Sequence, residues 1–246
     1  ELQQEARTRI RTASSYLLNL VNDVLDMNKL ESGNIQLERK HFNLLEVLHN
    51  TNEIIRVQAN ESGVNYYVED GEIIHTQLIG SPVHFQQILM NIGSNAVKYN
   101  QDGGSVTVSC REVSYTDTTA EYELTCTDTG IGMSEEFQKK AFEPFAQEGQ
   151  SARTKYAGTG LGLAIAKKLI ELQGGTLFFE SIQGKGTKFI LRIPFEISAE
   201  EQEKKSHMYQ NCSVEGVQIL LVEDNELNME IAEFLLKEEK MKVTKA

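Results

Sequence analysis

Three glycines stand at alternate positions directly before a helical pattern, and this run limits what the surrounding chain can fold into. Gly158, Gly160 and Gly162 lead into the apolar spacing of residues 161–173, which predicts a helix. Because a glycine destabilises a helix by up to about 1 kcal/mol relative to alanine, the run does not serve helix formation. It is either a loose connector or a loop whose backbone amides approach something bulky and charged.

The composition of the 246 residues is that of an ordinary globular chain, with 40% hydrophobic and 24% charged residues. This length allows one large domain or two small ones. The formal net charge of -12 argues against nucleic acid as a partner, because phosphates attract a basic surface. No stretch approaches the ~20 apolar residues that span a bilayer. The chain opens on Glu1 without a secretory signal, so we expect a cytoplasmic portion of a longer protein in which any membrane anchor lies upstream.

The cysteines predict no metal site, because none has CxxC spacing. Segments 105–113 and 121–128 alternate apolar and polar residues and predict a hairpin centred near Thr118. This centre places Cys110 opposite Cys126, on the face that also holds the apolar residues. We expect two reduced core thiols and no disulfide.

The first 33 residues predict one long helix that ends at Gly33. Its apolar residues step by three or four positions, close to the heptad spacing of a helical bundle; they are Leu2, Ala6, Ile10, Ala13, Leu17, Leu20, Val24 and Met27. We expect this stripe to pack against a helix outside the chain or against a second subunit. The alternative is a surface helix lying on the following domain.

Residues 34–196 predict the main domain. Asn43 with Glu46 resembles a capping box, and Ser81 with Pro82 predicts the start of a helix over 83–99. Short strands over 64–70 and 72–80, the hairpin, and a second hairpin over 174–181 and 186–195 supply a mainly antiparallel sheet. The predicted class is α+β, a two-layer α/β sandwich with helices on one face of the sheet.

The last 50 residues predict a linker and a small fragment. Residues 197–213 are polar without an apolar period, as in a linker. Within 214–246, the apolar run 217–225 ends in two carboxylates and predicts a buried parallel strand, followed by a helix over 226–238 and the start of another strand.

Four segments hold the candidate chemistry. The helix over 83–99 carries two asparagines four residues apart, which share a face. "TDTGIGMS" (127–134) follows a strand and places a carboxylate before two glycines. "FEPFAQ" (142–147) puts two aromatic residues beside a polar loop, and "GTGLGLAI" (158–165) holds the glycine run. Taken singly each has an ordinary explanation, since alternating glycines are more often a loop than a phosphate site.

Together and in this order, the four segments resemble the N, G1, F and G2 boxes of the ATP-binding domain of sensor histidine kinases. This domain has the Bergerat-type fold of the ATPase superfamily shared with DNA gyrase and the heat-shock chaperone of about ninety kilodaltons, and the resemblance covers residues 1 to about 196. It implies ATP and Mg²⁺ as cofactors. It also implies nucleotide contacts from Asn91, Asn95, Lys98, Tyr99, Asp128, Gly130, Ile131, Gly132, Met133, Phe142, Phe145, Arg153, Lys155, Gly158, Thr159, Gly160, Leu161 and Gly162.

The residues at the base end of such a site fit adenine. Asp128 can accept a hydrogen bond from the adenine amino group, which guanine would not satisfy. Gly130 and Gly132 let the backbone approach the base, because neither carries a Cβ. Tyr99 can pack near the ribose.

The residues at the phosphate end fit Mg-ATP. Asn91 and Asn95 offer neutral oxygens to a Mg²⁺ ion that phosphates already hold, while Lys98 offers a point charge. The glycine run presents free amides at the start of a helix. The loop over 146–157 resembles a mobile lid through Arg153 and Lys155, although these two are alternatively ordinary solvated charges.

One position distinguishes subfamilies, as the resemblance implies. Hydrolytic relatives carry a water-activating Glu four residues before the Mg²⁺-binding Asn, where this chain has Asn91, which cannot act as a general base at neutral pH. With Asn91 and Lys98 as the catalytic candidates, the expected reaction is transfer of the γ-phosphoryl group to a histidine. An ATPase of the gyrase or mismatch-repair type, or a non-catalytic nucleotide-binding dimerisation module, remain as alternatives.

The two ends of the chain carry further resemblances. The opening residues look like the second helix of a dimerisation and phosphotransfer hairpin, which implies a homodimer and a first helix with the acceptor histidine outside the chain. His41, His49, His75, His84 and His207 lack the motif of that acceptor. "ILLVEDNELN" resembles the first strand of a flavodoxin-like receiver domain, with Glu223 and Asp224 matching its acidic Mg²⁺ pair. A hybrid kinase is therefore expected, with a receiver, response regulator or phosphotransfer protein as partner.

Overall fold

The computed structural model describes residues 14, 17–18, 20–30, 32–33, 35–148, 159–199, 216–222, 226–238 and 240–245. The chain divides into two units, Glu1–Ser198 and Ala199–Ala246, and each is described by itself. Among the described residues, no helix is both long enough and apolar enough to cross a membrane.

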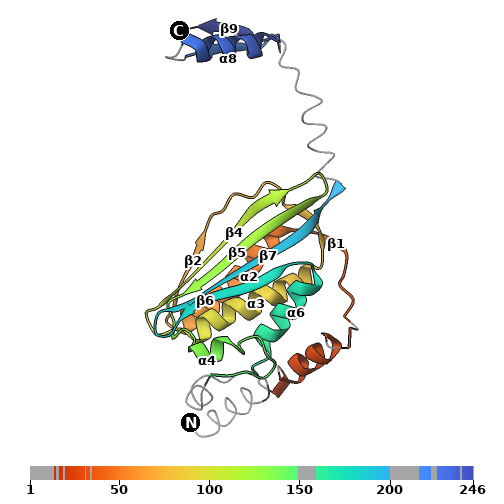
Figure 1. The fold of residues 1–246 in the computed structure, drawn as a ribbon, viewed down its shortest axis with the longest axis vertical. Helices are drawn as coiled ribbons and strands as arrows, with labels where there is room; N and C mark the ends of the chain where they lie inside the picture. The colour runs from red at the N-terminus through yellow and green to blue at the C-terminus, as the bar shows by residue number, and fades with distance from the viewer. Residues whose placement is uncertain are drawn as a thin grey trace, which may run out of the picture. The chain divides into compact units, whose positions relative to one another are not determined.

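The first unit is built on one mixed sheet of seven strands (Figure 1). The order is β1-β3-β7-β5-β4-β2, and β6 pairs with β7 beside this path. Among the described strand pairs of this sheet, β2 with β4 is parallel and the others are antiparallel. The strands are β1 (Lys40–Asn43), β2 (Asn65–Glu69), β3 (Gln77–Gly80), β4 (Ser105–Tyr115), β5 (Thr119–Asp128), β6 (Thr176–Ile182) and β7 (Gly186–Ile197).

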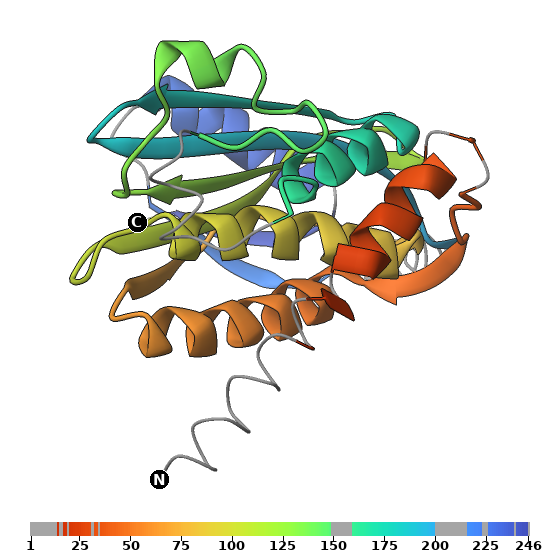
Figure 2. The same cartoon turned by 90° about the horizontal axis from the view of Figure 1, so that it is seen from below.

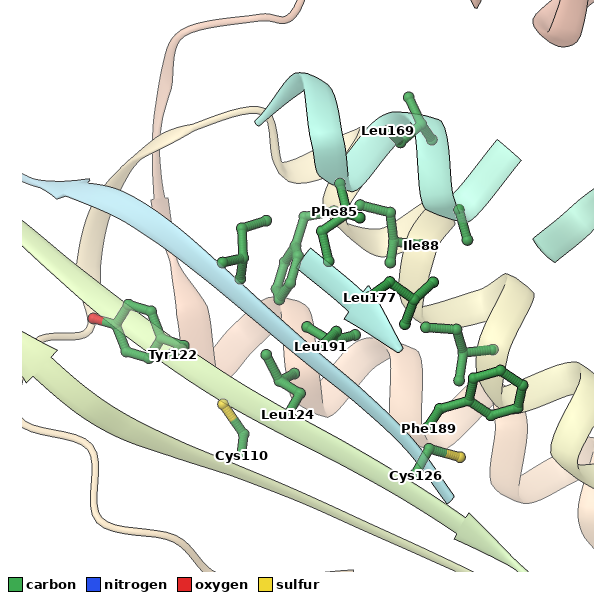
Figure 3. Close-up of a cluster of buried hydrophobic side chains, with 14 of the residues drawn as sticks. Phe85, Ile88, Cys110, Tyr122, Leu124, Cys126, Leu169, Leu177, Phe189 and Leu191 are labelled. Carbon is green, nitrogen blue, oxygen red and sulfur yellow. The ribbon is translucent and has the colours of Figure 1, made fainter. Parts of the chain in front are cut away.

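Helices α2 (Leu44–Glu61), α3 (Pro82–Lys98) and α6 (Gly162–Leu172) cover one face of this sheet, and the short α4 (Glu135–Gln138) lies near its end (Figure 1). The space between the layers holds the core, to which Phe85, Ile88, Leu177 and Leu191 contribute (Figure 3). The predicted α+β class, a two-layer α/β sandwich, is confirmed.

Of the two predicted helix starts, the one at Asn43 has a side-chain cap and the one at Ser81 does not. The Asn43 side chain accepts from Leu45 N at 2.8 Å and from Glu46 N at 3.3 Å, so it caps α2. Ser81 precedes Pro82 at the start of α3, but it makes no side-chain cap. Its hydroxyl instead pairs with His84 Nδ1 at 2.7 Å.

The register of the β4–β5 hairpin differs from the prediction. Cys110 pairs with Leu124, and Cys126 pairs with Val108. The predicted pairing of the two cysteines is wrong because the turn centre lies closer to Asp117 and a bulge shifts the register near residues 112–114. Both thiols are nevertheless free and buried on the inner face (Figure 3), and burial raises the pKa of each to about 12.

The helix at residues 20–30 packs on the main domain (Figure 2). Met27 and Leu30 are buried in its core, and Asp26 Oδ2 accepts from Gln87 Nε2 at 2.9 Å. The expectation that the apolar stripe has no partner within the chain is wrong at this end, because a short connection keeps the helix beside the domain. Val24 of the stripe also packs against this core, whereas Leu17 of the stripe and its neighbours Leu18, Val21 and Leu25 are exposed.

The second unit contains β8 (Gln218–Leu221), α8 (Glu226–Glu238) and β9 (Lys242–Lys245), with β8 parallel to β9. The strand is parallel to its neighbour, as predicted. The prediction that it is buried is wrong, because Leu220 is 63% exposed. A single helix covers at most one face of two strands, which leaves the other face open. Glu223 and Asp224 lie outside the described residues.

Candidate functional site

A cavity of about 560 Å³ lies between α3, the loop after β5 and the start of α6. Its size falls within the range of small-molecule sites. Eleven of the predicted site residues line it: Asn91, Asn95, Lys98, Tyr99, Asp128, Ile131, Gly132, Met133, Thr159, Gly160 and Gly162. These eleven residues come from three separate stretches of sequence, which therefore meet in one place.

Asp128 is the last residue of β5 and is buried, with 7% of the residue exposed. Its Oδ1 accepts from Gly130 N at 2.8 Å and from Thr187 N at 3.2 Å. Burial raises the pKa of Asp128 to about 6, although these two amides partly offset the effect. Both bonds fall on Oδ1, so the described residues leave Oδ2 available as an acceptor.

The two glycines after Asp128 are required by the protein's own packing. A Cβ at Gly130 would lie 2.3 Å from the Tyr99 carbonyl oxygen. Gly132 has a φ of +61°, and a Cβ there would lie 2.1 Å from the Ile182 carbonyl oxygen. The loop therefore sits tightly against the end of α3 and against β6, and this contact fixes the floor of the cavity. Gly130 itself does not line the cavity.

Asn91 and Asn95 lie one turn apart on α3 and both face the cavity. The Asn91 Nδ2 atom is buried and has no hydrogen-bond partner among the described residues. Such an orphaned amide destabilises a fold by about 1–3 kcal/mol unless a water or a ligand bonds to it. A Cβ added at Gly162 would lie 3.5 Å from Asn91 Oδ1, so the gap between α3 and α6 is about one atom deep there.

The start of α6 is open to the cavity. Leu161 occupies the N-cap position without a side-chain cap, and Gly162 and Leu163 line the cavity. Gly160 has a φ of +73°, and a Cβ there would lie 2.8 Å from the carbonyl carbon of Phe145. The free amides and the positive end of an 11-residue helix thus meet the same cavity as Asp128.

Two ionisable residues end α3. The Lys98 Nζ atom lies 4.8 Å from the centroid of the Tyr99 ring. Burial lowers the pKa of Lys98. Burial also raises the pKa of Tyr99, and the negative charge of Glu148 adds to this effect. Lys98 is thus a partly desolvated cation at the cavity wall.

Three predicted residues lie beside the cavity. Phe142 packs on Phe179 with ring centroids 5.4 Å apart, Phe145 is 61% exposed, and Leu161 is fully buried in the core. Their neighbours Ala141, Ala146 and Leu163 line the cavity instead. Arg153, Lys155 and Gly158 lie outside the described residues.

Sequence reasoning missed several lining residues: Asp23, Gln58, Met90, Ser94, Ala96, Phe137, Ala141, Ala146, Glu148, Leu163, Thr187 and Phe189. Helical spacing from Asn91 would have found Ser94, but strand pairing alone brings Thr187 to Asp128. Asp23 lies in the helix at residues 20–30, which the motifs do not include. Its Oδ2 accepts from Thr159 Oγ1 at 2.7 Å, which brings a carboxylate into the cavity wall.

The described residues contain no group of three or more His, Cys, Asp or Glu side chains that could hold a metal ion.

Residues 80–197 match the family of histidine kinase-, DNA gyrase B- and HSP90-like ATPases. The autoinducer 2 sensor kinase/phosphatase LuxQ of Vibrio vulnificus is 32% identical over 228 residues, which cover 92% of this chain and 26% of LuxQ. Hybrid signal transduction histidine kinase A of Dictyostelium discoideum is 36% identical over 203 residues, covering 79% of this chain and 9% of that protein. The chain thus spans about a quarter or less of these relatives.

The solved structure of full-length ShkA in complex with AMPPNP shares the fold, with a TM-score of 0.66 and 24% sequence identity, covering 100% of this chain and 49% of that one. Family match, relatives and fold agree. The domain that contains residues 80–197 belongs to the histidine kinase-, DNA gyrase B- and HSP90-like ATPase family, and it is of the kind found in the catalytic part of hybrid sensor histidine kinases.

Proposed function

We propose that the cavity binds Mg-ATP and that the domain transfers its γ-phosphoryl group to a histidine on a helical bundle. The observation that carries the proposal is the pairing of two features across one cavity, the buried Asp128 carboxylate and the open start of α6. The carboxylate suits a base with an amino group, and the start of the helix suits phosphate.

At the base end, Asp128 Oδ2 accepts from the adenine amino group while Oδ1 stays with its two backbone amides. Because these amides hold the carboxyl group in place, little freedom is lost when the base binds. Ile131 and Met133 line the same end with apolar side chains.

At the phosphate end, the amides of the first turn of α6 donate to phosphate oxygens. The orphaned Asn91 amide and the gap at Gly162 support a fit for Mg-phosphate here. Asn91 and Asn95 would hold a Mg²⁺ ion through neutral oxygens. When bound, the ion would neutralise charge on the phosphates.

Transfer depends on positioning rather than on a protein base. The histidine nitrogen forms a bond to the γ-phosphorus, the bond from that phosphorus to the β–γ bridging oxygen breaks, and ADP leaves with the electron pair. Lys98 supports the charge that develops on the phosphates. Asn91 offers an amide that cannot take a proton from water, which favours transfer over hydrolysis.

The resemblances at the two ends extend this proposal to domains and partners. Residues 1–33 act as the second bundle helix of a homodimer, and 34–196 bind the nucleotide. A linker over 197–213 leads to 214–246, the first part of a receiver, where Glu223 and Asp224 contribute to a second Mg²⁺ site. The histidine passes its phosphoryl group to a receiver or response regulator.

The test supplies the purified chain with radiolabelled Mg-ATP and a histidine-bearing helical hairpin from a sensor kinase. The proposal expects an acid-labile label on the hairpin and little free phosphate. An ATPase of the gyrase type would instead release phosphate without labelling the hairpin. In a parallel arm, Asn91→Glu raises phosphate release if the missing base is what suppresses hydrolysis. A wild-type chain that releases phosphate as fast as this variant would contradict the assignment.

A further inference from the structure

A second cavity, of about 270 Å³, lies between α2 and the inner face of the sheet. Leu48 and Ile55 of α2 line one side, and Val108, Leu124 and Leu191 of the sheet line the other. Figure 3 shows Leu124 and Leu191 on the strands that form this wall. An apolar cavity of about 150 Å³ is sufficient for benzene, so this one has room for a two-ring aromatic molecule.

Several polar groups that line this cavity already have hydrogen-bond partners. The Tyr66 hydroxyl donates to Asn52 Oδ1 at 2.8 Å, the hydroxyls of Ser109 and Thr125 pair at 2.8 Å, and Thr51 Oγ1 donates to the Val47 carbonyl at 2.7 Å. The thiols of Cys110 and Cys126 also line it and stay neutral at physiological pH. The interior therefore favours an apolar ring over a polar ligand.

Negative charge lines the outer part of the same cavity. Glu69 and Asp70 both contribute to it and are exposed, and neither forms an ion pair within the described ranges. The guanidinium of Arg56 lies 6.0 Å from the Tyr66 ring centroid, but it is paired with Glu53. A cationic group at this rim is thus attracted and an anionic one repelled.

We propose that this cavity is a second ligand site of the domain, which takes a small aromatic amine with its ring between α2 and the sheet and its ammonium group beside Glu69 and Asp70. The site shares walls with the nucleotide cavity. Phe189 lines both cavities, and α3 separates them, with Ile92 and Gly93 on one side and Asn91 and Asn95 on the other. Occupation of one cavity therefore changes the affinity of the other.

Tryptamine is a suitable probe, because the chain contains no tryptophan and the indole fluorescence of the ligand is observed without background. The anisotropy of tryptamine rises on titration with the protein. Indole-3-acetate has the same ring and the opposite charge, so it binds about tenfold more weakly. In the double variant Glu69→Gln with Asp70→Asn the two ligands bind with similar affinity. Equal binding of both ligands to the wild-type chain would refute the role of the acidic rim.

Two variants on the same strand locate the ring. Val108→Phe fills the cavity and abolishes tryptamine binding, whereas Val113→Phe, at an exposed position of β4 outside both cavities, leaves it unchanged. A far-UV circular dichroism spectrum and a cooperative thermal transition like those of the wild type show that each variant is folded. Should Val108→Phe not fold, methyl NMR of the wild-type chain replaces it, and shifts at Leu48 and Ile55 support the site while shifts confined elsewhere overturn it.

Saturating Mg-ADP separates the two cavities. The proposal expects tryptamine to bind in its presence with an altered dissociation constant. If Mg-ADP displaces tryptamine competitively, the indole binds in the nucleotide cavity. This result, together with unchanged tryptamine binding to Val108→Phe, would overturn the proposal. The tryptamine titrations without nucleotide require neither nucleotide binding nor phosphoryl transfer, so their failure and the failure of the proposed function are distinguishable.

Discussion

Replacing Asp128 with asparagine tests the base end of the nucleotide site. Oδ1 of the wild-type side chain is held by the amides of Gly130 and Thr187. In Asp128→Asn, the amide oxygen takes over these two bonds, so its NH₂ group faces the ligand. Two donors then meet where the adenine amino group needs an acceptor. Losing a hydrogen bond to a charged group weakens an interaction by about 1.5–3 kcal/mol, which is about ten- to more than a hundredfold in dissociation constant.

The assay is calorimetric titration with adenosine, which carries no phosphate to titrate. With its pKa raised to about 6 by burial, Asp128 is mostly ionised at pH 7 and mostly protonated at pH 5. The wild-type affinity for adenosine therefore falls about tenfold between pH 7 and pH 5. The asparagine variant binds adenosine weakly, and its affinity does not change between pH 7 and pH 5. A variant that binds adenosine as tightly as wild type, or that keeps its pH dependence, would refute adenine recognition by this carboxylate.

Three further predictions concern single substitutions around the cavity. Asp23 brings negative charge into the cavity wall at Thr159, so Asp23→Asn strengthens Mg-ATP binding about two- to fivefold at low salt and less at high salt, as titrations at two salt concentrations would show. A Cβ at Gly162 meets only ordinary contacts with Asn91, so Gly162→Ala leaves the thermal midpoint within a few degrees of wild type while it weakens Mg-ATP binding. Gly132→Ala, where φ is +61° and the Cβ would meet a backbone carbonyl, lowers the unfolding free energy by about 2 kcal/mol or more in chemical denaturation. If Gly162→Ala and Gly132→Ala lowered the unfolding free energy equally, Gly132 would not be the glycine that the fold requires and Gly162 the one that the ligand requires.

The elements of the main domain were predictable because their signals are local. Asn43 caps α2 through its own side chain, and the alternation along β4 and β5 fixes which face is buried. The register was not predictable to the residue. A bulge near residue 113 and a turn displaced by half a residue move Cys110 from Cys126 to Leu124, and neither leaves a mark in the period-two pattern.

In the candidate site, too, features with a local signal were predictable and those that depend on tertiary packing were not. Residues that belong to short motifs, such as Asn95 and Asp128, line the cavity. The aromatic pair of the third segment does not, because Phe142 turns to Phe179 and Phe145 turns outward. Thr187 reaches the site only because β7 lies beside β5. Which of two adjacent residues faces a cavity depends on tertiary packing, and a single sequence carries little information about it.

Asp128 also makes a prediction about stability, and the sign follows from its raised pKa. Between about pH 4 and pH 6 the folded chain binds a proton that the unfolded chain has released, so the unfolding free energy of the wild type falls as pH rises through this window. A shift from 3.8 to about 6 corresponds to about 3 kcal/mol. Asp128→Asn has no such group, so urea unfolding finds it more stable than wild type at pH 7, by up to about this amount, with the difference shrinking toward pH 4. A variant less stable at pH 7 would mean that the carboxylate supports the fold. The opposite result means that the domain keeps a destabilising charge in place for its ligand.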